Sequence, residues 1–403
     1  MKIFIVQSHI GGGGAERVGV LLAGGLAQRG HEAFLVTNLY DEVKYPVDER
    51  VEVLNMVSSN QHKLMKWMSA VRNLRKLVKE YQPDVIVGIM QLSSLISKLA
   101  CVGTKTHVIM TEHDSFERPP SAPMSKMEYF CKFYLNRIYE CVTVITQADK
   151  DFIGNRLKNV QVMPNPLLLQ PVREIPQKKK VILAAGRLDA WHYKGFDVLI
   201  KAWGLLIHNA QFSRLAVARR SGKAERTIDN EGWRLQIAGT GSEESLQYLK
   251  SLCKENGVED SVDFLGFVSD MESLYKKASV FVLSSRYEGF GLVLIEAMSQ
   301  GCACIACDYK GRQREIMETL PGPPCLGRGA EVQNAKGDPF FETPTGILCP
   351  PEDVEALAAA LKRMIGDREY REPVRQPAIE RSMHYSIENT TLRWNDLLNK
   401  VNS

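Results

Sequence analysis

Two carboxylates, Glu288 and Glu296, stand with seven residues between them in a segment that is otherwise apolar or rich in glycine. The pattern predicts a strand, a glycine-rich turn and then a helix that begins near Gly291. The first amides of a helix have no partner inside it and attract anions, so a phosphate could bind at Gly291, Leu292 and Val293. Glu288 would lie in the turn. Glu296 would lie inside the helix among apolar residues, where a carboxylate needs a partner such as a ribose diol, or a capping or ion-pair group.

Two cations follow another predicted strand. Arg187 comes directly after Gly186 at the end of that strand, and Lys194 precedes the Gly195-Phe196-Asp197 that opens a helix. A guanidinium offers a planar fork of donors and an ammonium a compact charge, and both bind phosphates. Either cation alone would be interpreted as a surface charge. Together with the two glutamates, the pair predicts a diphosphate site at the end of the strand.

Four consecutive glycines, at 11–14, follow the first predicted strand and precede a helix. Glycine lets backbone amides approach a ligand closely, and the helix presents further amides to an anion. The run is not a dinucleotide-binding fingerprint, because Glu16 stands where that pattern needs its last glycine. A plain tight turn would need only one or two glycines. We therefore expect Gly12, Gly13 and Gly14 to form a loop for a phosphate or an acceptor.

Short apolar strands alternate with amphipathic helices, which predicts an α/β fold with parallel sheets built from βαβ units. Strands are expected at 2–7, 33–38, 51–55, 84–89, 107–111, 142–146, 160–163, 181–186, 233–238, 262–265, 279–283 and 302–306. Helices are expected at 15–29, 63–80, 91–100, 124–140, 195–207, 243–256, 271–276, 291–300 and 383–401. A solvated loop is expected at 207–231, with contact to an anionic partner as the alternative, and another loop at 321–342.

A segment rich in proline and lysine at 164–180 separates two α/β domains. We expect the first domain at 1–170 and the second at 171–382, with the helix at 383–403 packing back on the first. Parallel sheets bind ligands at the carboxyl ends of their strands, so a ligand cleft between the domains is expected.

The composition is that of a folded protein, with 44% hydrophobic and 24% charged residues and a net charge of +4. This mild charge does not indicate nucleic acid as a partner. No apolar run reaches the roughly 18 residues of a membrane span, and the N-terminus lacks a signal-peptide core, so a cytoplasmic location is expected. Nine cysteines are scattered along the chain. Their one cluster, at 302–307, is interpreted as a buried strand rather than a metal site.

Taken together, these motifs resemble the family-4 retaining glycosyltransferases of GT-B fold, in which two Rossmann-like domains face each other across a cleft. The Glu-x7-Glu pair carries the resemblance, which extends over nearly the whole chain. The supporting motifs are Gly13–Val18, Asn165-Pro166, Gly186-Arg187-Leu188, Lys194–Asp197, Ile237–Gly241 and Phe264–Val268. After Asp308 the family often has a Gly-Gly pair, whereas this chain has Tyr309-Lys310-Gly311-Arg312, so the resemblance does not assign the sugar.

The resemblance implies a role for each motif. Arg187 and Lys194 would hold the donor diphosphate, and Glu288 would contact the transferred sugar. Glu296 would bind the ribose, and the backbone near Phe267 and Val268 the base. The remaining donor-binding residues would be Phe290, Gly291, Leu292, Val293, Gly239 and Gly241.

The implied reaction is retaining transfer of a hexose or N-acetylhexosamine from a nucleoside-diphosphate sugar, UDP-linked rather than GDP-linked. Charge grows on the leaving diphosphate, so cations and helix amides would stabilise the transition state. No Asp-x-Asp motif follows a predicted strand, so no metal and no cofactor are expected. A sugar-nucleotide epimerase and a non-catalytic sugar-nucleotide-binding protein are the alternatives, and the intact set of Arg187, Lys194, Glu288 and Glu296 argues against both.

His113 follows the predicted strand 107–111 within Thr111-Glu112-His113-Asp114. A lone histidine is more often structural than catalytic. Members of the family carry a similar sequence there, so we expect His113 to take part in binding the acceptor or the donor sugar, with Glu112 and Asp114 as weaker candidates.

Two segments of the first domain combine cations with apolar stripes, helix 63–80 and segment 116–140. The cations are Lys63, Lys66, Arg72, Arg75, Lys76, Lys79, Arg118, Lys126, Lys132 and Arg137. Both segments could lie on an anionic membrane, which would suit a lipid-linked or polysaccharide-precursor acceptor and a position on the inner face of the cytoplasmic membrane. The alternative is two ordinary helices with core stripes and solvated charges.

Overall fold

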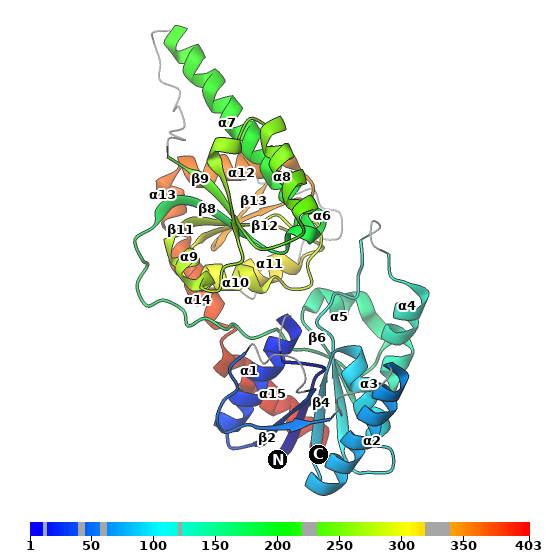
Figure 1. The fold of residues 1–403 in the computed structure, drawn as a ribbon. Coiled ribbons are helices and arrows are strands. Elements are labelled where there is room, and N and C mark those ends of the chain that lie inside the picture. Colours follow the sequence, from blue (N-terminus) through cyan, green and yellow to red (C-terminus); the bar gives the residue numbers. More distant parts are fainter. Residues whose placement is uncertain (11–13, 39–44, 57–62, 120–122, 220–231, 319–338) are drawn as a thin grey trace. The chain divides into compact units, whose positions relative to one another are not determined.

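The computed structural model describes residues 1–10, 14–38, 45–56, 63–119, 123–219, 232–318 and 339–403. The chain divides into two compact units. The first combines Met1–Leu168 with Tyr385–Ser403, and the second is Leu169–His384. Each unit is built on one sheet of seven strands (Figure 1). The predicted α/β class with parallel sheets is thereby confirmed.

The sheet of the first unit is parallel throughout, in the order β3-β2-β1-β4-β5-β6-β7. The strands are β1 (Lys2–Val6), β2 (Glu32–Thr37), β3 (Glu52–Asn55), β4 (Val85–Ile89), β5 (His107–Thr111), β6 (Cys141–Val144) and β7 (Val160–Val162). Central strands such as Ile3–Val6 are buried completely because helices cover both faces of such a sheet. The strand order reverses between β1 and β4, which is where open α/β sheets bind ligands.

The helices of the first unit are α1 (Gly14–Gln28), α2 (Lys63–Tyr81), α3 (Met90–Ala100), α4 (Lys126–Phe133), η1 (Leu135–Ile138), α5 (Gln147–Ile153), η2 (Gly154–Arg156) and α15 (Ile387–Asn402). The last of these, α15, packs against α1, with Trp394 and Leu398 buried between them and the sheet. The two helices approach so closely that a Cβ on Gly25 would lie 2.4 Å from the Thr391 hydroxyl.

The sheet of the second unit has the order β10-β9-β8-β11-β12-β14-β13. Its strands are β8 (Lys179–Ala185), β9 (Arg234–Ala238), β10 (Val262–Gly266), β11 (Ala278–Leu283), β12 (Ala303–Cys307), β13 (Phe341–Thr343) and β14 (Gly346–Cys349). All pair in parallel except β13 with β14. Here the order reverses between β8 and β11.

The helices of the second unit are η3 (Leu188–Ala190), α6 (Trp191–Lys194), α7 (Phe196–Arg219), α8 (Glu243–Glu255), η4 (Glu259–Ser261), α9 (Met271–Lys277), α10 (Leu292–Ser299), α11 (Arg312–Met317), α12 (Val354–Gly366), α13 (Arg368–Arg371) and α14 (Arg375–Met383). The predicted cysteine-rich strand is confirmed: Cys304 and Cys307 in β12, and Cys302 directly before it, are buried. Among the described residues, no helix combines the length and apolar character needed to cross a membrane.

Two predicted segments differ from the structure. The expected loop 207–231 is wrong for its first half, because α7 continues to Arg219. No glycine or proline interrupts 207–219, so nothing in the backbone stops the helix there. The expected single helix 124–140 is also wrong: α4 ends at Phe133 and the short 3₁₀ turn η1 follows.

Candidate functional site

Two loops of the second unit meet at the point where its strand order reverses. One follows β8 and contains Gly186, Arg187 and α6, and the other follows β11 and contains Ser284 to Gly291. The side chain of Lys194 crosses directly over Gly186, so that a Cβ on that glycine would lie 3.1–3.3 Å from three of its methylene carbons. The lysine is thereby directed from the end of α6 toward the β11 loop.

Lys194 and Glu288 form an ion pair between these two loops. The ammonium Nζ lies 2.7 Å from Oε1 and 3.1 Å from Oε2 of the carboxylate. Both side chains are largely buried. The sequence predicted that each would face the ligand, and the structure brings them together in direct contact.

Arg286 ties the same two loops together beside this pair. Its guanidinium donates to both oxygens of Asp197, at 2.6 and 2.8 Å, and to the carbonyl of His192 at 2.6 Å. Its backbone amide also donates to the carbonyl of Tyr193, and its Nε to Glu352. The hydrogen bonds that Arg286 donates to Asp197 raise the pKa of Arg286, so the guanidinium stays charged.

The backbone between α6 and β11 leaves room only for glycine at position 195. Gly195 has a φ of +64°, and a Cβ there would lie 1.9 Å from the carbonyl oxygen of Ser284. The hydroxyl of Ser284 in turn donates to the carbonyl of Lys194 at 2.8 Å. The backbone of Lys194 is therefore held by Ser284 at its own carbonyl and by Arg286 at the carbonyls of the two residues before it.

Helix α10 begins next to Glu288. Its N-cap, Gly291, has a φ of +90°, and a Cβ there would meet the Glu288 side chain at 3.5 Å. The amides of the first turn, including those of Leu292 and Val293, have no acceptor within the helix. The predicted anion site at the start of α10 therefore adjoins the Lys194–Glu288 pair.

Glu296 is buried in α10, as the sequence predicted, and it has a partner within the protein. The hydroxyl of Tyr275, on α9, donates to Oε2 of the carboxylate at 3.1 Å. Tyr275 is itself fully buried. The sequence pattern did not point to this tyrosine, because it precedes β11 whereas Glu296 follows that strand.

The remaining predicted donor residues lie at the ends of β8, β9 and β10. The amide of Gly239 donates to the carbonyl of Gly266, and Gly241 packs against Leu188 and Asp189. Arg187 is exposed. Phe267, which follows β10, exposes 79% of its side chain, so its ring is available to a flat ligand. Val268 lies beside it.

Of the three cations that distinguish this chain after Asp308, the two arginines contact other groups of the protein. Arg314 lies 3.3 Å from the carboxylate of Asp308, and both are largely buried. Arg312 is completely buried and stacks over the ring of Tyr309. Lys310 alone among them is exposed, with a φ of +57°.

In the first unit, His113 follows β5 and is held through both ring nitrogens. Nε2 lies 3.0 Å from the hydroxyl of Thr111, and Nδ1 lies 2.9 Å from Oδ1 of Asn165. Burial lowers the pKa of His113 to about 4, so the imidazole is neutral at physiological pH. Asn165 belongs to the Asn-Pro motif before the second unit, so this contact joins two of the motifs found in the sequence.

The segments that follow β1 and β4 lie beside His113 at the carboxyl ends of the strands of this sheet. Met90, directly after β4, has a φ of +66°, which is unusual for a residue other than glycine. The adjacent Gln91 has a buried side-chain amide whose nitrogen and oxygen both lack a partner among the described residues. Sequence reasoning missed Gln91 because it reads as an ordinary first residue of a helix. Gly14 opens α1, whereas Gly12 and Gly13 lie outside the described residues.

A buried polar cluster supports the loop that carries His113. Lys132, from α4, donates to the carbonyl of Ser115 at 2.9 Å and lies 3.4 Å from the carboxylate of Glu112. Burial raises the pKa of Glu112, and Lys132 opposes that rise. Arg118 pairs with Asp114 and Glu128. The interpretation of Lys132 and Arg118 as membrane-facing cations is therefore wrong, because both face protein carboxylates.

Helix α4 presents a stripe of apolar side chains to the solvent. Met127 and Phe130 on α4, and Tyr134 directly after it, occur at helical spacing and are 71%, 53% and 50% exposed. In α2, Leu74 and Val78 are core residues and Val71 packs beside them, whereas Trp67 and Met68 are 41% and 70% exposed. We call Met127, Phe130 and Tyr134 the α4 stripe.

Comparison with known proteins agrees with this architecture. Residues 179–367 match the family of glycosyl transferases group 1, and residues 12–169 match glycosyltransferase family 4. The amylovoran biosynthesis glycosyltransferase AmsD of Erwinia amylovora is 27% identical over 98% of this chain and 99% of its own length. The GalNAc-alpha-(1->4)-GalNAc-alpha-(1->3)-diNAcBac-PP-undecaprenol alpha-1,4-N-acetyl-D-galactosaminyltransferase of Campylobacter jejuni is 25% identical over 100% and 99%.

Among solved structures, HepE from Anabaena in complex with UDP has the same fold, with a TM-score of 0.72 over 99% of this chain and all of that one, at 18% identity. The two sheets, the reversal of strand order and the motifs at the strand ends thus define a GT-B glycosyltransferase. The chain belongs to glycosyltransferase family 4, and it is an enzyme of that class.

Proposed function

We propose that this enzyme transfers a hexose or N-acetylhexosamine from a UDP-linked donor to a lipid-linked or polysaccharide-precursor acceptor in cell-envelope glycan or glycolipid synthesis. The observation that carries the proposal is the Lys194–Glu288 pair, placed at the strand reversal and beside the start of α10. The names of the relatives support the acceptor class, since one acts in amylovoran biosynthesis and one on an undecaprenol-linked glycan. The UDP complex of HepE supports the nucleotide.

Donor binding would exchange the partners of Lys194. An arriving diphosphate carries more negative charge than a single carboxylate, so it competes with Glu288 for the ammonium. Glu288 would then be released at the position where the transferred sugar meets the diphosphate. Arg187 and the first amides of α10 would hold the other phosphate oxygens, and Glu296 would accept from the ribose while Tyr275 fixes its orientation.

Charge on the leaving diphosphate would be neutralised by protein groups alone. Two cations and the start of a helix would stabilise the charge that develops on the diphosphate, and such electrostatic stabilisation is the largest contribution in many enzymes. We therefore propose a reaction that needs no metal ion. We also propose retention, with attack on the face from which the diphosphate departs, as the resemblance to the family-4 retaining enzymes implies. Glu288 and Glu296 come from one unit and do not form the pair that flanks a bond in glycosidases.

The acceptor would bind at the carboxyl edge of the first sheet, beside His113 and the amide of Gln91, which has no partner in the described part of the chain. A neutral His113 with both nitrogens engaged would orient the acceptor site rather than exchange protons. The α4 stripe would lie in the membrane interface and bring a lipid-linked acceptor to that edge. Aromatic side chains such as Phe130 and Tyr134 suit this interface because their rings tolerate its mixed polarity.

The test is to incubate the full chain with a panel of UDP- and GDP-sugars and a membrane lipid extract, and to follow sugar in lipid and water phases. Transfer to lipid, with the anomeric configuration of the donor kept in the product, is the expected result. An epimerised donor without transfer would identify an epimerase instead. Saturable binding of nucleotide without any turnover would identify a non-catalytic binding protein.

A further inference from the structure

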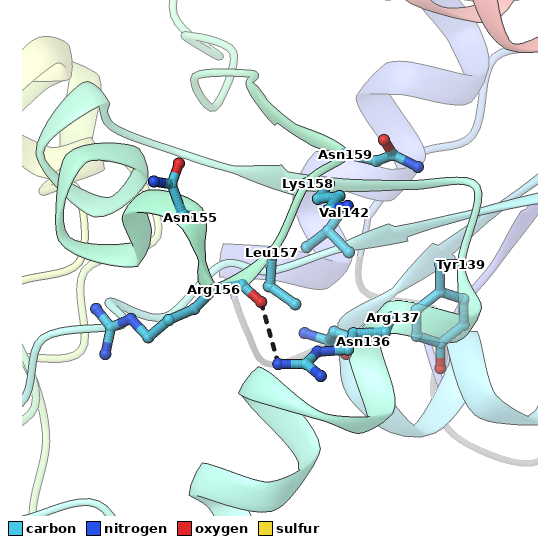
Figure 2. A pocket seen from close by; sticks show the side chains of 9 residues that line it. All are labelled: Asn136, Arg137, Tyr139, Val142, Asn155, Arg156, Leu157, Lys158 and Asn159. Carbon is cyan, nitrogen blue, oxygen red and sulfur yellow. Dashed lines mark hydrogen bonds between the residues drawn. The ribbon is translucent and has the colours of Figure 1, made fainter.

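A cavity of about 410 Å³ at the amino ends of β6 and β7 offers a ligand only surface charges (Figure 2). The polar atoms of Asn136 and Tyr139 that have no partner among the described residues expose less than 1 Å² each, so they are closed off from the cavity. The cations Arg137 and Lys158 are exposed on the surface. A polar contact that is completely formed lies instead in the second unit, beside the candidate donor site.

The carboxylate of Asp189 joins two loops at the carboxyl edge of the second sheet. Asp189 lies in η3, directly after Gly186-Arg187-Leu188, whereas its partners Ser242 and Ser245 lie at the start of α8. Its Oδ1 accepts from the amide and the hydroxyl of Ser242, both at 2.7 Å, and from the hydroxyl of Ser245 at 2.9 Å. We call these three hydrogen bonds the Asp189 brace. They lower the pKa of Asp189, the one from the Ser242 amide most of all, so the carboxylate is charged at neutral pH.

The backbone that follows Arg187 is in close contact with the same neighbouring loop. The amide of Leu188 donates to the carbonyl of Thr240 at 2.8 Å. A Cβ on Gly241 would lie 2.7 Å from the Cβ of Leu188 and 2.8 Å from the amide nitrogen of Asp189. The two loops therefore cannot approach each other further, and the hydrogen bonds of the brace keep them from separating.

The segment 187–194 is held at its other end as well. Trp191, in α6, packs on Tyr248 of α8 with the ring centroids 4.3 Å apart, and Arg286 binds the backbone just before Lys194. The segment carries both cations of the candidate diphosphate site, Arg187 at its start and Lys194 at its end. The Asp189 brace at the start is thus the counterpart of Arg286 at the end.

We propose that Asp189 is a positioning residue of the donor site, which holds the segment of Arg187 against the start of α8. This inference rests on the proposed donor site. Without the brace, the segment would become ordered only when the donor binds, and that ordering would cost affinity. The charge of Asp189 opposes a diphosphate nearby, because like charges repel. What the carboxylate contributes to donor binding is therefore the position of Arg187.

Replacing Asp189 distinguishes position from charge by the sign of the effect on UDP affinity. Asp189→Ala should bind UDP about tenfold less tightly than the wild type, because ordering the freed segment then opposes binding. Asp189→Asn keeps an oxygen that can accept the same hydrogen bonds and loses the charge, so it should bind UDP at least as tightly as the wild type. Calorimetry with the full chain measures both affinities. Tighter binding by both variants would mean that Asp189 acts through its charge, and the positioning role would be wrong.

A matched control and a second perturbation of the same contact accompany these variants. Glu244→Ala removes an exposed acid from the first turn of α8 that takes no part in the brace, so it should bind UDP like the wild type. Gly241→Ala changes no charge but presses its methyl group against Leu188 and the backbone of Asp189, so it should weaken UDP binding as Asp189→Ala does. Wild-type affinity in both Asp189→Ala and Gly241→Ala would overturn the proposal.

The dependence on Arg187 separates a positioning role from a general loss of structure. In an Arg187→Gln background, Asp189→Ala should weaken UDP binding by no more than about twofold, because the side chain that it positions is already absent. The full loss in that background would show that Asp189 does not act through Arg187.

The wild type distinguishes a failure of this inference from a failure of the proposed function. If the wild type binds neither UDP nor GDP, the proposed donor site is wrong, and the positioning role falls with it. If the wild type binds UDP and Asp189→Ala binds it equally well, the donor site stands and only the positioning role is wrong.

Discussion

Arg286 and Asp197 are 89 residues apart in the chain, yet their side chains meet through two parallel hydrogen bonds of 2.6 and 2.8 Å. The contact joins the loop that follows β11 to the first turn of α7. Because Lys194 lies between Asp197 and the carbonyl of His192 that Arg286 also binds, this contact sets where the ammonium of Lys194 can lie. Arg286 is in this sense a positioning residue.

Arg286→Lys should lower kcat about tenfold to a hundredfold, since a displacement of about 1 Å at a reacting centre can cost that much. Lysine keeps the positive charge near Asp197 but cannot donate the two parallel hydrogen bonds of the guanidinium. Alanine would leave Asp197 buried and unpaired, at a cost of about 3–5 kcal/mol in the free energy of unfolding. Glu352→Gln, which removes only the exposed partner of Arg286, is the control and should change stability by no more than about 1 kcal/mol. Steady-state kinetics of a folded Arg286→Lys variant that matched the wild type would contradict the positioning role.

Replacing the members of the Lys194–Glu288 pair should have opposite effects on nucleotide affinity. Lys194→Met should weaken UDP binding and lower kcat by about a hundredfold or more, because it removes charge stabilisation of the leaving group. Glu288→Gln should tighten UDP binding, since the ammonium no longer has to leave a carboxylate, while kcat falls. Calorimetry with UDP and steady-state kinetics measure the two quantities. Lys201→Met, at an exposed position on α7, is the matched control, and weaker UDP binding in Glu288→Gln would refute the exchange of partners.

Stability should depend on pH through His113. Burial lowers its pKa from 6.5 to about 4, so between these values the unfolded chain binds a proton that the folded chain does not. The free energy of unfolding should therefore fall as the pH drops from 6.5 toward 4, by up to about 3 kcal/mol from this residue. His113→Gln should lose that part of the pH dependence. Urea denaturation of both proteins at several pH values measures it, and two parallel curves would show that His113 does not titrate in this way.

The buried pair of Lys132 and Glu112 should be strongly coupled. Lys132→Met should lower the free energy of unfolding by about 3–5 kcal/mol, because it leaves Glu112 buried without its cation. Adding Glu112→Gln in the same chain should restore much of that loss. A double-mutant cycle by chemical denaturation gives the coupling energy, and strictly additive effects would mean that the two side chains act independently.

Removal of divalent ions should leave transfer activity largely intact. The proposed mechanism neutralises the diphosphate with Arg187, Lys194 and the start of α10, so EDTA should lower the rate by less than about twofold, a barrier change below roughly 0.5 kcal/mol. The assay compares EDTA-treated enzyme with the same enzyme after Mg²⁺ is added back. A complete loss that Mg²⁺ reverses would refute the metal-free proposal.

The fold class could be predicted because buried parallel strands and their covering helices leave clear periodic patterns in the sequence. The strand-end motifs could be placed for the same reason. The sequence also predicted a buried Glu296 that needs a partner, but not that Tyr275 is a partner, since that contact depends on how α9 packs on α10.

The contacts between motifs could not be predicted. Lys194 and Glu288 are 94 residues apart, and only the pairing of β8 with β11 brings them together. No role was predicted for Arg286, because its partner Asp197 is 89 residues away in the sequence. Lys132 was expected to face outward, but α4 turns its lysine toward Glu112 and its apolar stripe toward solvent.

The first unit contains the last helix of the chain, and this has a consequence for synthesis. While the ribosome makes the second unit, the face of α1 that α15 will cover, including Gly25, has no partner. The N-terminal unit can be completed only after Tyr385–Ser403 has emerged, so its folding has to wait until the second unit has been synthesised. Nascent chains that stall in the second unit should therefore expose apolar surface and depend on chaperones.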